Sequence, residues 1–224
     1  MTWIRRGWFW WLDYWYVSVQ QLRGVFARVP REFAQGTGQP VLLLAGVYEP
    51  WFLLRGIGRR LSEAGHPVHV ITRLGYNRTS LTEAAEAIAS YLESSDLRDV
   101  ILVAHSKGGL VGKQVMATPR VADRVHSLIA IATPFSGSSL APYIPSRTIR
   151  ALGPTDSLIV ALAAHLDLNS RITSIYGEFD PHIPGGSELP GATNVRVLMV
   201  GHFRVLADSR VIRAVLDAAA GVAD

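Results

Sequence analysis

The stretch Val100-Ile101-Leu102-Val103-Ala104-His105-Ser106-Lys107-Gly108-Gly109 decides the fold of this 224-residue chain. Its first half is a continuous apolar run, which is typical of a strand buried on both faces of a parallel sheet. The pattern after it predicts a helix over 110–116. Ser106 therefore lies at the apex of a sharp strand-to-helix turn, where a serine can be an ordinary helix N-cap. The residues two before and two after it, Ala104 and Gly108, are small, as a nucleophile elbow requires.

Other apolar runs predict further strands of the same sheet. They cover residues 41–45, 68–72, 128–132, 172–176 and 195–200. Helical patterns lie between and after them, over 52–63, 81–93 and 205–219. Strands that alternate with helices predict a doubly wound, mostly parallel α/β fold of about six strands. A turn-rich linker at 36–40 precedes it, so we expect one catalytic domain over residues 40–224.

Composition and charge exclude several classes of protein. With 49% hydrophobic and 18% charged residues, the chain is neither disordered nor a coiled coil. The absence of cysteine excludes disulfide scaffolds, thiolate metal sites and cysteine nucleophiles. The net charge of +4 comes from residues 1–31, which hold five arginines and one acid, whereas the remaining residues hold 17 bases and 17 acids. The body therefore has no excess of basic residues, and we expect no nucleic-acid partner.

The N-terminal segment, residues 1–35, is rich in tryptophan and arginine. Five of the six tryptophans lie in the first fifteen residues, and a stripe at helical spacing predicts an amphipathic helix: Trp8, Trp11, Leu12, Trp15, Val19, Leu22 and Phe26. Asp13 interrupts the apolar run, which is too short to cross a bilayer. Tryptophan, tyrosine and arginine favour the boundary of a membrane. We therefore expect an interfacial anchor and a peripheral membrane location, at the cell envelope or the cytoplasmic face.

Other interpretations of this segment stay open. The helix can instead pack on the body or on a partner chain, in which case a homo-oligomer is possible. The basic pair Arg5-Arg6 followed by an apolar run can also belong to a secretory signal or a twin-arginine export signal.

The chain offers a base and an acid for Ser106. A serine hydroxyl becomes a nucleophile when a base takes its proton and an acid orients that base, and in this fold class the partners follow in the order acid, then histidine. Asp180 follows the predicted strand 172–176, and His202 follows the strand 195–200. We predict that these three residues are catalytic, with other acids as alternatives for Asp180: Asp156, Asp167 and Glu178.

Two backbone N–H groups are expected to form the oxyanion hole. One belongs to Lys107, the residue after the proposed nucleophile. The other should come from the loop after the first strand, where Val47 is the first choice and Tyr48 the second. The pair His66 and His69 has no third ligand near it in the sequence, so we expect no metal.

These features resemble the α/β-hydrolase superfamily, and within it the compact bacterial triacylglycerol lipases and related esterases. The resemblance runs from about 41 to 219 and is carried by five motifs: Leu44-Ala45-Gly46-Val47, Ala104-His105-Ser106-Lys107-Gly108-Gly109, Ala132-Thr133-Pro134-Phe135-Ser136-Gly137, Asp180-Pro181-His182-Ile183-Pro184 and Gly201-His202-Phe203. It implies a serine hydrolase that cleaves carboxylic esters of lipids or other acyl compounds through an acyl-enzyme, without a cofactor. It also implies that an insertion at about 136–167 forms a cap over the acyl pocket.

The sequence departs from the family pattern at two positions. The oxyanion strand usually ends in His-Gly and here ends in Ala45-Gly46, and Lys107 replaces a residue that is more often neutral. The lysine suggests a preference for anionic substrates. Cleavage of thioesters or amides also stays open, because the same triad serves all acyl transfer. The alternative from another class is a catalytically silent α/β-hydrolase fold that serves as a membrane-associated binding or assembly module.

Overall fold

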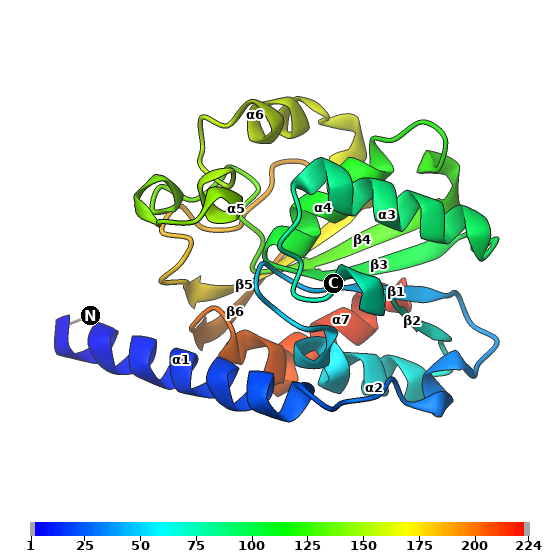
Figure 1. The fold of residues 1–224 in the computed structure, drawn as a ribbon, viewed down its shortest axis with the longest axis horizontal. Coiled ribbons are helices and arrows are strands. Elements are labelled where there is room, and N and C mark those ends of the chain that lie inside the picture. Colours follow the sequence, from blue (N-terminus) through cyan, green and yellow to red (C-terminus); the bar gives the residue numbers. More distant parts are fainter. Residues whose placement is uncertain (1–2, 222–224) are drawn as a thin grey trace.

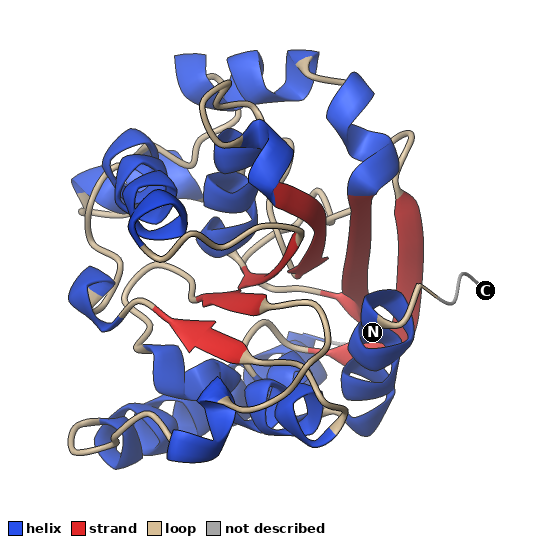
Figure 2. Ribbon diagram, turned by 90° about the vertical axis from the view of Figure 1, so that its right-hand side faces the viewer, coloured by secondary structure: helices blue, strands red, loops and turns tan. Residues whose placement is uncertain are grey.

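The computed structural model describes residues 3–221, with side chains from residue 10 onward. The side chains of Trp3, Arg5, Arg6, Trp8 and Phe9, on which part of the N-terminal prediction rests, lie outside the described residues. The described chain forms a sheet of six parallel strands with helices on both faces, which confirms the predicted fold class (Figures 1 and 2).

The strands match the apolar runs closely. In the order in which they lie in the sheet, they are β2 (Val68–Val70), β1 (Val41–Leu44), β3 (Val100–His105), β4 (Val125–Ile131), β5 (Ile172–Phe179) and β6 (Thr193–Val200). Every residue of the two strands β1 and β3 is buried. A strand covered on both faces has no polar side to show, which is why its sequence is continuously apolar.

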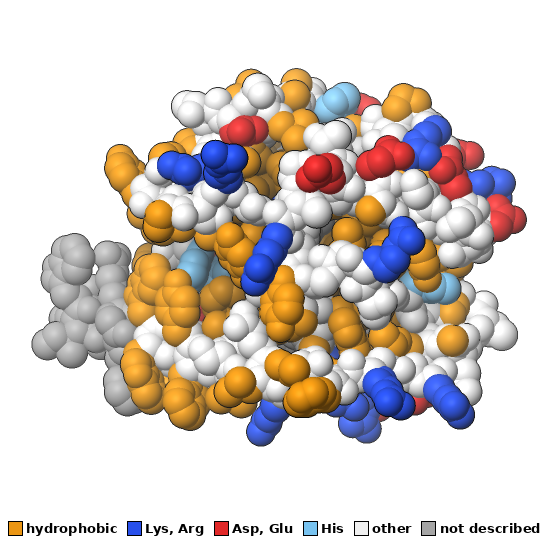
Figure 3. Space-filling view, in the orientation of Figure 1, with side chains coloured by type: hydrophobic (Ala, Val, Ile, Leu, Met, Phe, Trp, Pro, Cys, Tyr) orange, Lys and Arg blue, Asp and Glu red, His pale blue; other side chains and the backbone are white. Residues whose placement is uncertain are grey.

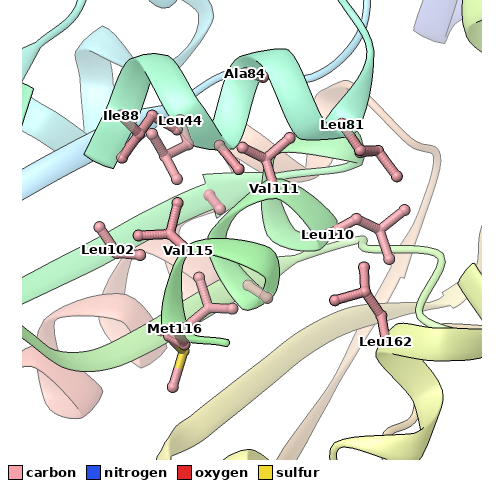
Figure 4. Packing of buried hydrophobic residues seen from close by; sticks show 14 of the residues in the cluster. Leu44, Leu81, Ala84, Ile88, Leu102, Leu110, Val111, Val115, Met116 and Leu162 are labelled. Carbon is pink, nitrogen blue, oxygen red and sulfur yellow. The ribbon is translucent and has the colours of Figure 1, made fainter. Parts of the chain in front are cut away.

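Two hydrophobic cores lie on opposite faces of this sheet. One contains side chains of α3 (Leu81–Ser94), α4 (Lys107–Met116) and α6 (Ser157–Ala164), and Figure 4 shows Leu110, Val111 and Val115 of α4 between the neighbouring elements. The other contains side chains of α1 (Trp3–Gly24), α2 (Arg55–Glu63) and α7 (Ser209–Ala219).

The remaining elements are short. They are α5 (Arg147–Arg150) and the 3₁₀ helices η1 (Arg31–Ala34), η2 (Trp51–Leu54), η3 (Thr72–Leu74), η4 (Ala122–Arg124), η5 (Ala141–Tyr143), η6 (Asp167–Arg171) and η7 (Arg204–Ala207). Local caps fix where several helices begin. At α3, Ser80 accepts a hydrogen bond from Glu83 N while the Glu83 carboxylate accepts one from Ser80 N, so the two residues form a capping box.

The N-terminal helix has its apolar stripe on the outside. The side chains of Trp15, Leu22 and Phe26 are 61%, 74% and 92% exposed, whereas Asp13 is completely buried against the body. Hydrophobic periodicity located this stripe correctly but did not show which face the body covers. The helix therefore packs on its own domain with one face, and its exposed face carries aromatic and aliphatic side chains.

No helix in the described part of the chain combines the length and the apolar character needed to cross a membrane.

Candidate active site

The turn at Ser106 has the strained geometry of a nucleophile elbow. Ser106 has φ +52° and ψ −124°, between the end of β3 and the first residue of α4. A Cβ at Gly108 would overlap the carbonyl oxygen of Leu44, and one at Gly109 would overlap the side chain of Thr133. The small residues are therefore needed because α4 passes directly against β1 and the segment after β4. This backbone conformation is neither that of a strand nor that of a helix. The Ser106 side chain therefore projects from the apex of the turn.

The structure brings the three predicted residues together. The Ser106 hydroxyl lies 2.9 Å from His202 Nε2, and His202 Nδ1 lies 2.6 Å from Asp180 Oδ2. All three side chains are buried, and they follow β3, β5 and β6 at the carboxyl edge of the sheet. Ser106 and His202 are 96 positions apart in the sequence, and Asp180 and His202 are 22 positions apart, yet the fold brings all three side chains into contact.

None of the alternative acids is hydrogen-bonded to His202 among the described residues. Asp156 caps α6 by accepting a hydrogen bond from Leu158 N, and Glu178 lies on the surface 3.7 Å from Arg196. Asp167 begins η6. Asp180 also accepts hydrogen bonds from the backbone N–H groups of His182 and Ile183, at 2.8 and 3.2 Å, which hold its carboxylate toward His202.

The surroundings shift the pKa values of both partners. Burial alone lowers the pKa of His202, but the charge and hydrogen bond of Asp180 raise it, and Glu49 and Asp13 add to this, so it lies above the ordinary 6.5. Burial alone raises the pKa of the Asp180 carboxyl, but the interactions with His202 and His182 outweigh it and hold that pKa below 3.8. The aspartate is therefore ionised at neutral pH.

A pH profile checks this arrangement. A histidine that acts as a base works only when neutral, so activity falls as the pH falls through its pKa. Because the pKa of His202 is raised, its cationic form persists to higher pH, and the acidic limb of kcat/KM should lie above pH 6.5. An acidic limb centred below pH 6.5, measured with a substrate that does not titrate, would contradict the predicted coupling to Asp180.

The predicted oxyanion loop lies beside the serine. Val47 and Tyr48 both line the same cavity as Ser106, and Tyr48 has a positive φ of +59°. The Glu49 carboxylate closes the loop by accepting a hydrogen bond from Gly46 N at 2.8 Å. Lys107 is the first residue of α4, so its backbone N–H has no intrahelical acceptor. Lys107 thus stays the candidate for one donor, and Val47 and Tyr48 both stay candidates for the other.

The side chain of Lys107 does not face the cavity. Its ammonium is buried and donates hydrogen bonds to the Asn77 carbonyl (2.9 Å), Asn77 Oδ1 (3.0 Å) and the Thr79 carbonyl (2.5 Å). Burial lowers the pKa of Lys107 to about 8. The lysine therefore fastens the 77–79 loop to α4, and the expected preference for anionic substrates loses its structural basis.

Sequence reasoning missed a second buried pair at the site. His105 Nδ1 lies 2.8 Å from Glu49 Oε2, and His105 Nε2 lies 2.9 Å from the carbonyl oxygen of His202. That carbonyl only accepts, so Nε2 donates to it, while Nδ1 lies against the carboxylate of Glu49. The pair links the predicted oxyanion loop to the backbone of His202. The signal was invisible in the sequence, since Glu49 and His105 are 56 residues apart.

Three of these groups are close enough to hold a metal ion. Ligand atoms of Glu49, His105 and His202 lie within 4.8 Å of one another. However, each ring nitrogen of the two histidines already faces a hydrogen-bond partner, and the ring of His202 lies between Ser106 and Asp180. The donor set therefore fits a hydrogen-bond network better than a metal centre.

His182 is another residue of the site that the sequence does not single out, because there it stands only as a neighbour of Asp180. Its ring centroid lies 4.8 Å from that of His202, and burial followed by the charge of His202 lowers its pKa to about 3. Its Nε2 is buried and has no hydrogen-bond partner among the described residues. A neutral His182 therefore covers one side of His202 and limits its access to water.

A cavity of about 440 Å³ opens onto Ser106 and His202. Its walls come from several segments that are far apart in the sequence, among them Trp10, Tyr14 and Val17 of α1, the 47–49 loop, and the segment 138–152. This last segment lies within the predicted cap and contributes Leu140, Ala141, Ile144, Ile149 and Leu152. The volume is in the range typical of small-molecule sites, and the lining is mostly aliphatic and aromatic.

Comparison with known proteins supports the fold assignment. The model of the PGAP1-like alpha/beta domain matches residues 73–143, which include β3, the Ser106 turn and β4. No curated protein sequence matches the chain. Together, the fold and this match show that the chain is an α/β-hydrolase-fold protein, as the resemblance implied.

Several solved structures are similar to it. The mature lipase BlEst2 of Bacillus licheniformis has 17% identity and a TM-score of 0.66, over 87% of this chain and 95% of that one. Lipase B of Aspergillus fumigatus has 18% identity and a TM-score of 0.72, over 86% of this chain and 55% of that one. The monoacylglycerol lipase of Paleococcus ferrophilus has 17% identity and a TM-score of 0.56, over 83% of this chain and 96% of that one. At these identities the likeness establishes the shared fold, and the chemistry has to be argued from the site.

Proposed function

We propose that the protein is a serine hydrolase that cleaves carboxylic esters through an acyl-enzyme. The observation that carries this proposal is the hydrogen-bonded chain from Ser106 through His202 to Asp180, at 2.9 and 2.6 Å, under a largely apolar cavity. The similarity to lipase structures is consistent with it.

The geometry supports the following steps. The Ser106 hydroxyl attacks the acyl carbonyl while His202 Nε2 takes its proton, and Asp180 stabilises the resulting imidazolium. The carbonyl oxygen becomes negative and is held by the N–H groups of Lys107 and of Val47 or Tyr48. The carbonyl re-forms, and the alcohol leaves with the proton from His202. Water activated by His202 then attacks the acyl-enzyme, and the acid leaves as Ser106 regains its proton.

The cavity favours an apolar acyl chain. Its walls above Ser106 include Trp10, Tyr14 and Val17 of α1 and the aliphatic side chains of the 138–152 segment, with no lysine or arginine side chain in its lining among the described residues. An acyl chain placed there removes apolar surface from water, which stabilises the complex in proportion to chain length. A negatively charged acyl chain has no cationic partner in that lining.

Hydrolysis of p-nitrophenyl esters of graded chain length tests this proposal. We expect kcat/KM to rise from acetate to medium-chain esters, by about three- to fourfold for each methylene that becomes fully buried. Esters of dicarboxylic acids should react poorly. If the wild-type protein hydrolyses none of these esters, nor a matching thioester or amide, the catalytically silent module would be the better account.

We further propose that the protein works at a lipid surface. Exposed aromatic and aliphatic side chains lie on two of the segments that contribute to the cavity: Trp11, Tyr14, Trp15, Leu22 and Phe26 on or just after α1, and Leu140, Tyr143 and Ile144 on the 138–152 segment. Figure 3 shows hydrophobic side chains gathered along α1 and across the hollow from it. Arg23, Arg28 and Arg31 follow on the same segment, so the surface fits an anionic membrane.

Vesicle binding tests this second proposal. The double variant Trp15→Ala/Phe26→Ala should bind vesicles of anionic phosphatidylglycerol at least about tenfold more weakly than wild type, because each side chain loses buried apolar area. Leu166→Ala, which removes an exposed side chain just after α6, is the control and should bind normally. Equal binding by the double variant and the control would reject α1 as the membrane contact.

A further inference from the structure

The N-terminal helix reaches into the catalytic centre through one buried carboxylate. Asp13 Oδ2 accepts a hydrogen bond from His202 N at 2.9 Å, and Asp13 Oδ1 accepts from Phe203 N at 3.0 Å and Arg204 N at 2.9 Å. These donors are consecutive backbone groups at the start of the segment that carries the histidine, 189 to 191 residues away in sequence. Both oxygens of the carboxylate therefore serve as acceptors.

The histidine segment is shaped to receive this carboxylate. Gly201 has φ +123°, a conformation that favours glycine, and a Cβ there would lie 2.8 Å from Asp13 Oδ1. From the other side, the carbonyl of His202 accepts a hydrogen bond from His105 Nε2. The backbone of His202 is thus held at its N–H by α1 and at its carbonyl by the elbow.

The same helix also holds the oxyanion loop. Gln21 lies two turns after Asp13, and its Nε2 donates a hydrogen bond to the carbonyl oxygen of Tyr48 at 3.0 Å. Tyr48 is the residue with a positive φ next to Val47, so its peptide sets the direction of that loop. One helix therefore contacts both the segment of the base and the loop opposite the nucleophile.

We propose that Asp13 and Gln21 are positioning residues, through which the N-terminal helix sets the geometry of His202 and of the oxyanion loop. This inference rests on the proposed function, since it assigns these residues a role in the same reaction. Under it, the helix whose outer aromatic face would meet the lipid also holds the catalytic base with its inner face. Attachment and catalysis then depend on one element.

The experiment measures how fast a fluorophosphonate probe modifies Ser106 in the full-length chain. Asp13→Asn keeps the size of the side chain but turns one acceptor into an NH₂ group that faces backbone donors. We expect the rate constant of labelling, and kcat for ester hydrolysis, to fall by about 10- to 100-fold, because small displacements of a catalytic group cost this much. Asp123→Asn, the same change on the surface element η4, should leave both unchanged.

Two readouts separate positioning from loss of fold. The final extent of labelling counts competent molecules, so a positioning defect gives slow but complete labelling, whereas unfolding gives a smaller labelled fraction at the normal rate. Asp13→Asn should also move the acidic limb of kcat/KM to lower pH, since the charge of Asp13 contributes to the raised pKa of His202. The other titratable groups around His202 stay in place: Asp180, His182, His105 and Glu49.

The outcomes are distinct for each claim. A wild-type labelling rate and an unshifted pH profile in Asp13→Asn would overturn the inference while leaving the proposed function intact. If Asp13→Asn yields no folded protein, Gln21→Leu provides the test: labelling several-fold slower, at full extent, supports the positioning role, and a wild-type rate rejects it. Absence of Ser106-dependent labelling in the wild-type protein would reject the proposed function itself.

Discussion

Replacement of Ser106 by alanine is expected to lower ester hydrolysis by about 10⁴- to 10⁶-fold, to the level left by substrate binding and the oxyanion hole. The Ser106 hydroxyl, 2.9 Å from His202 Nε2, is the group that forms the acyl bond in the proposed reaction. Alanine removes one oxygen atom from a buried site and leaves the positive φ of the turn, so the fold should remain.

The control for this variant is a serine nearby that should not react. Ser138 also lines the cavity, but its hydroxyl donates to the carbonyl oxygen of His182 at 2.6 Å rather than to a base. Ser138→Ala should therefore keep most of the activity. If Ser106→Ala retains wild-type hydrolysis, or Ser138→Ala loses it to the same degree, the assignment of the nucleophile is wrong.

Asp180→Asn should be the second most damaging change, with kcat lowered by about 10⁴-fold. Asp180 accepts hydrogen bonds from His202 Nδ1 and from two backbone N–H groups. Both oxygens of its carboxylate are therefore needed as acceptors. An asparagine that turns its NH₂ toward His202 forces the proton onto Nε2. That nitrogen then faces Ser106 as a donor and can no longer take its proton.

Glu178→Gln is the matched control for Asp180→Asn. Glu178 lies two residues earlier, on the surface beside Arg196, and was an alternative acid in the sequence. We expect full activity from this variant in a kcat measurement at saturating ester. Loss of activity in Glu178→Gln with retention in Asp180→Asn would reverse the assignment.

The sheet could be predicted from the sequence because burial on both faces leaves a local signature. Val100 to Val103 and Val41 to Leu44 are apolar at every position, and the turn chemistry around Ser106 is set by residues at fixed offsets. Asp180 and His202 could be chosen as the candidate acid and base because parallel strands bring their carboxyl ends to one edge of the sheet.

The contacts that support the site could not be predicted in the same way. In the sequence, Asp13 is only a polar residue that interrupts an apolar helix. The backbone N–H of His202, which donates to it, lies 189 residues away. Periodicity identified the stripe through Trp15 and Phe26 but contains no information about which face the domain covers. The sequence shows that Lys107 is charged. The direction in which its side chain points depends on the carbonyl groups of the 77–79 loop, which the sequence does not place.

In the proposed mechanism, the environment of the Ser106 hydroxyl makes it reactive. The most direct measurement is to label the purified protein with a fluorophosphonate and to locate the added mass by peptide mapping. We expect one adduct per chain, on the peptide that contains Ser106, and no adduct when His202 is replaced by alanine. Stoichiometric labelling at another residue, or none under conditions in which the fold is intact, would contradict it.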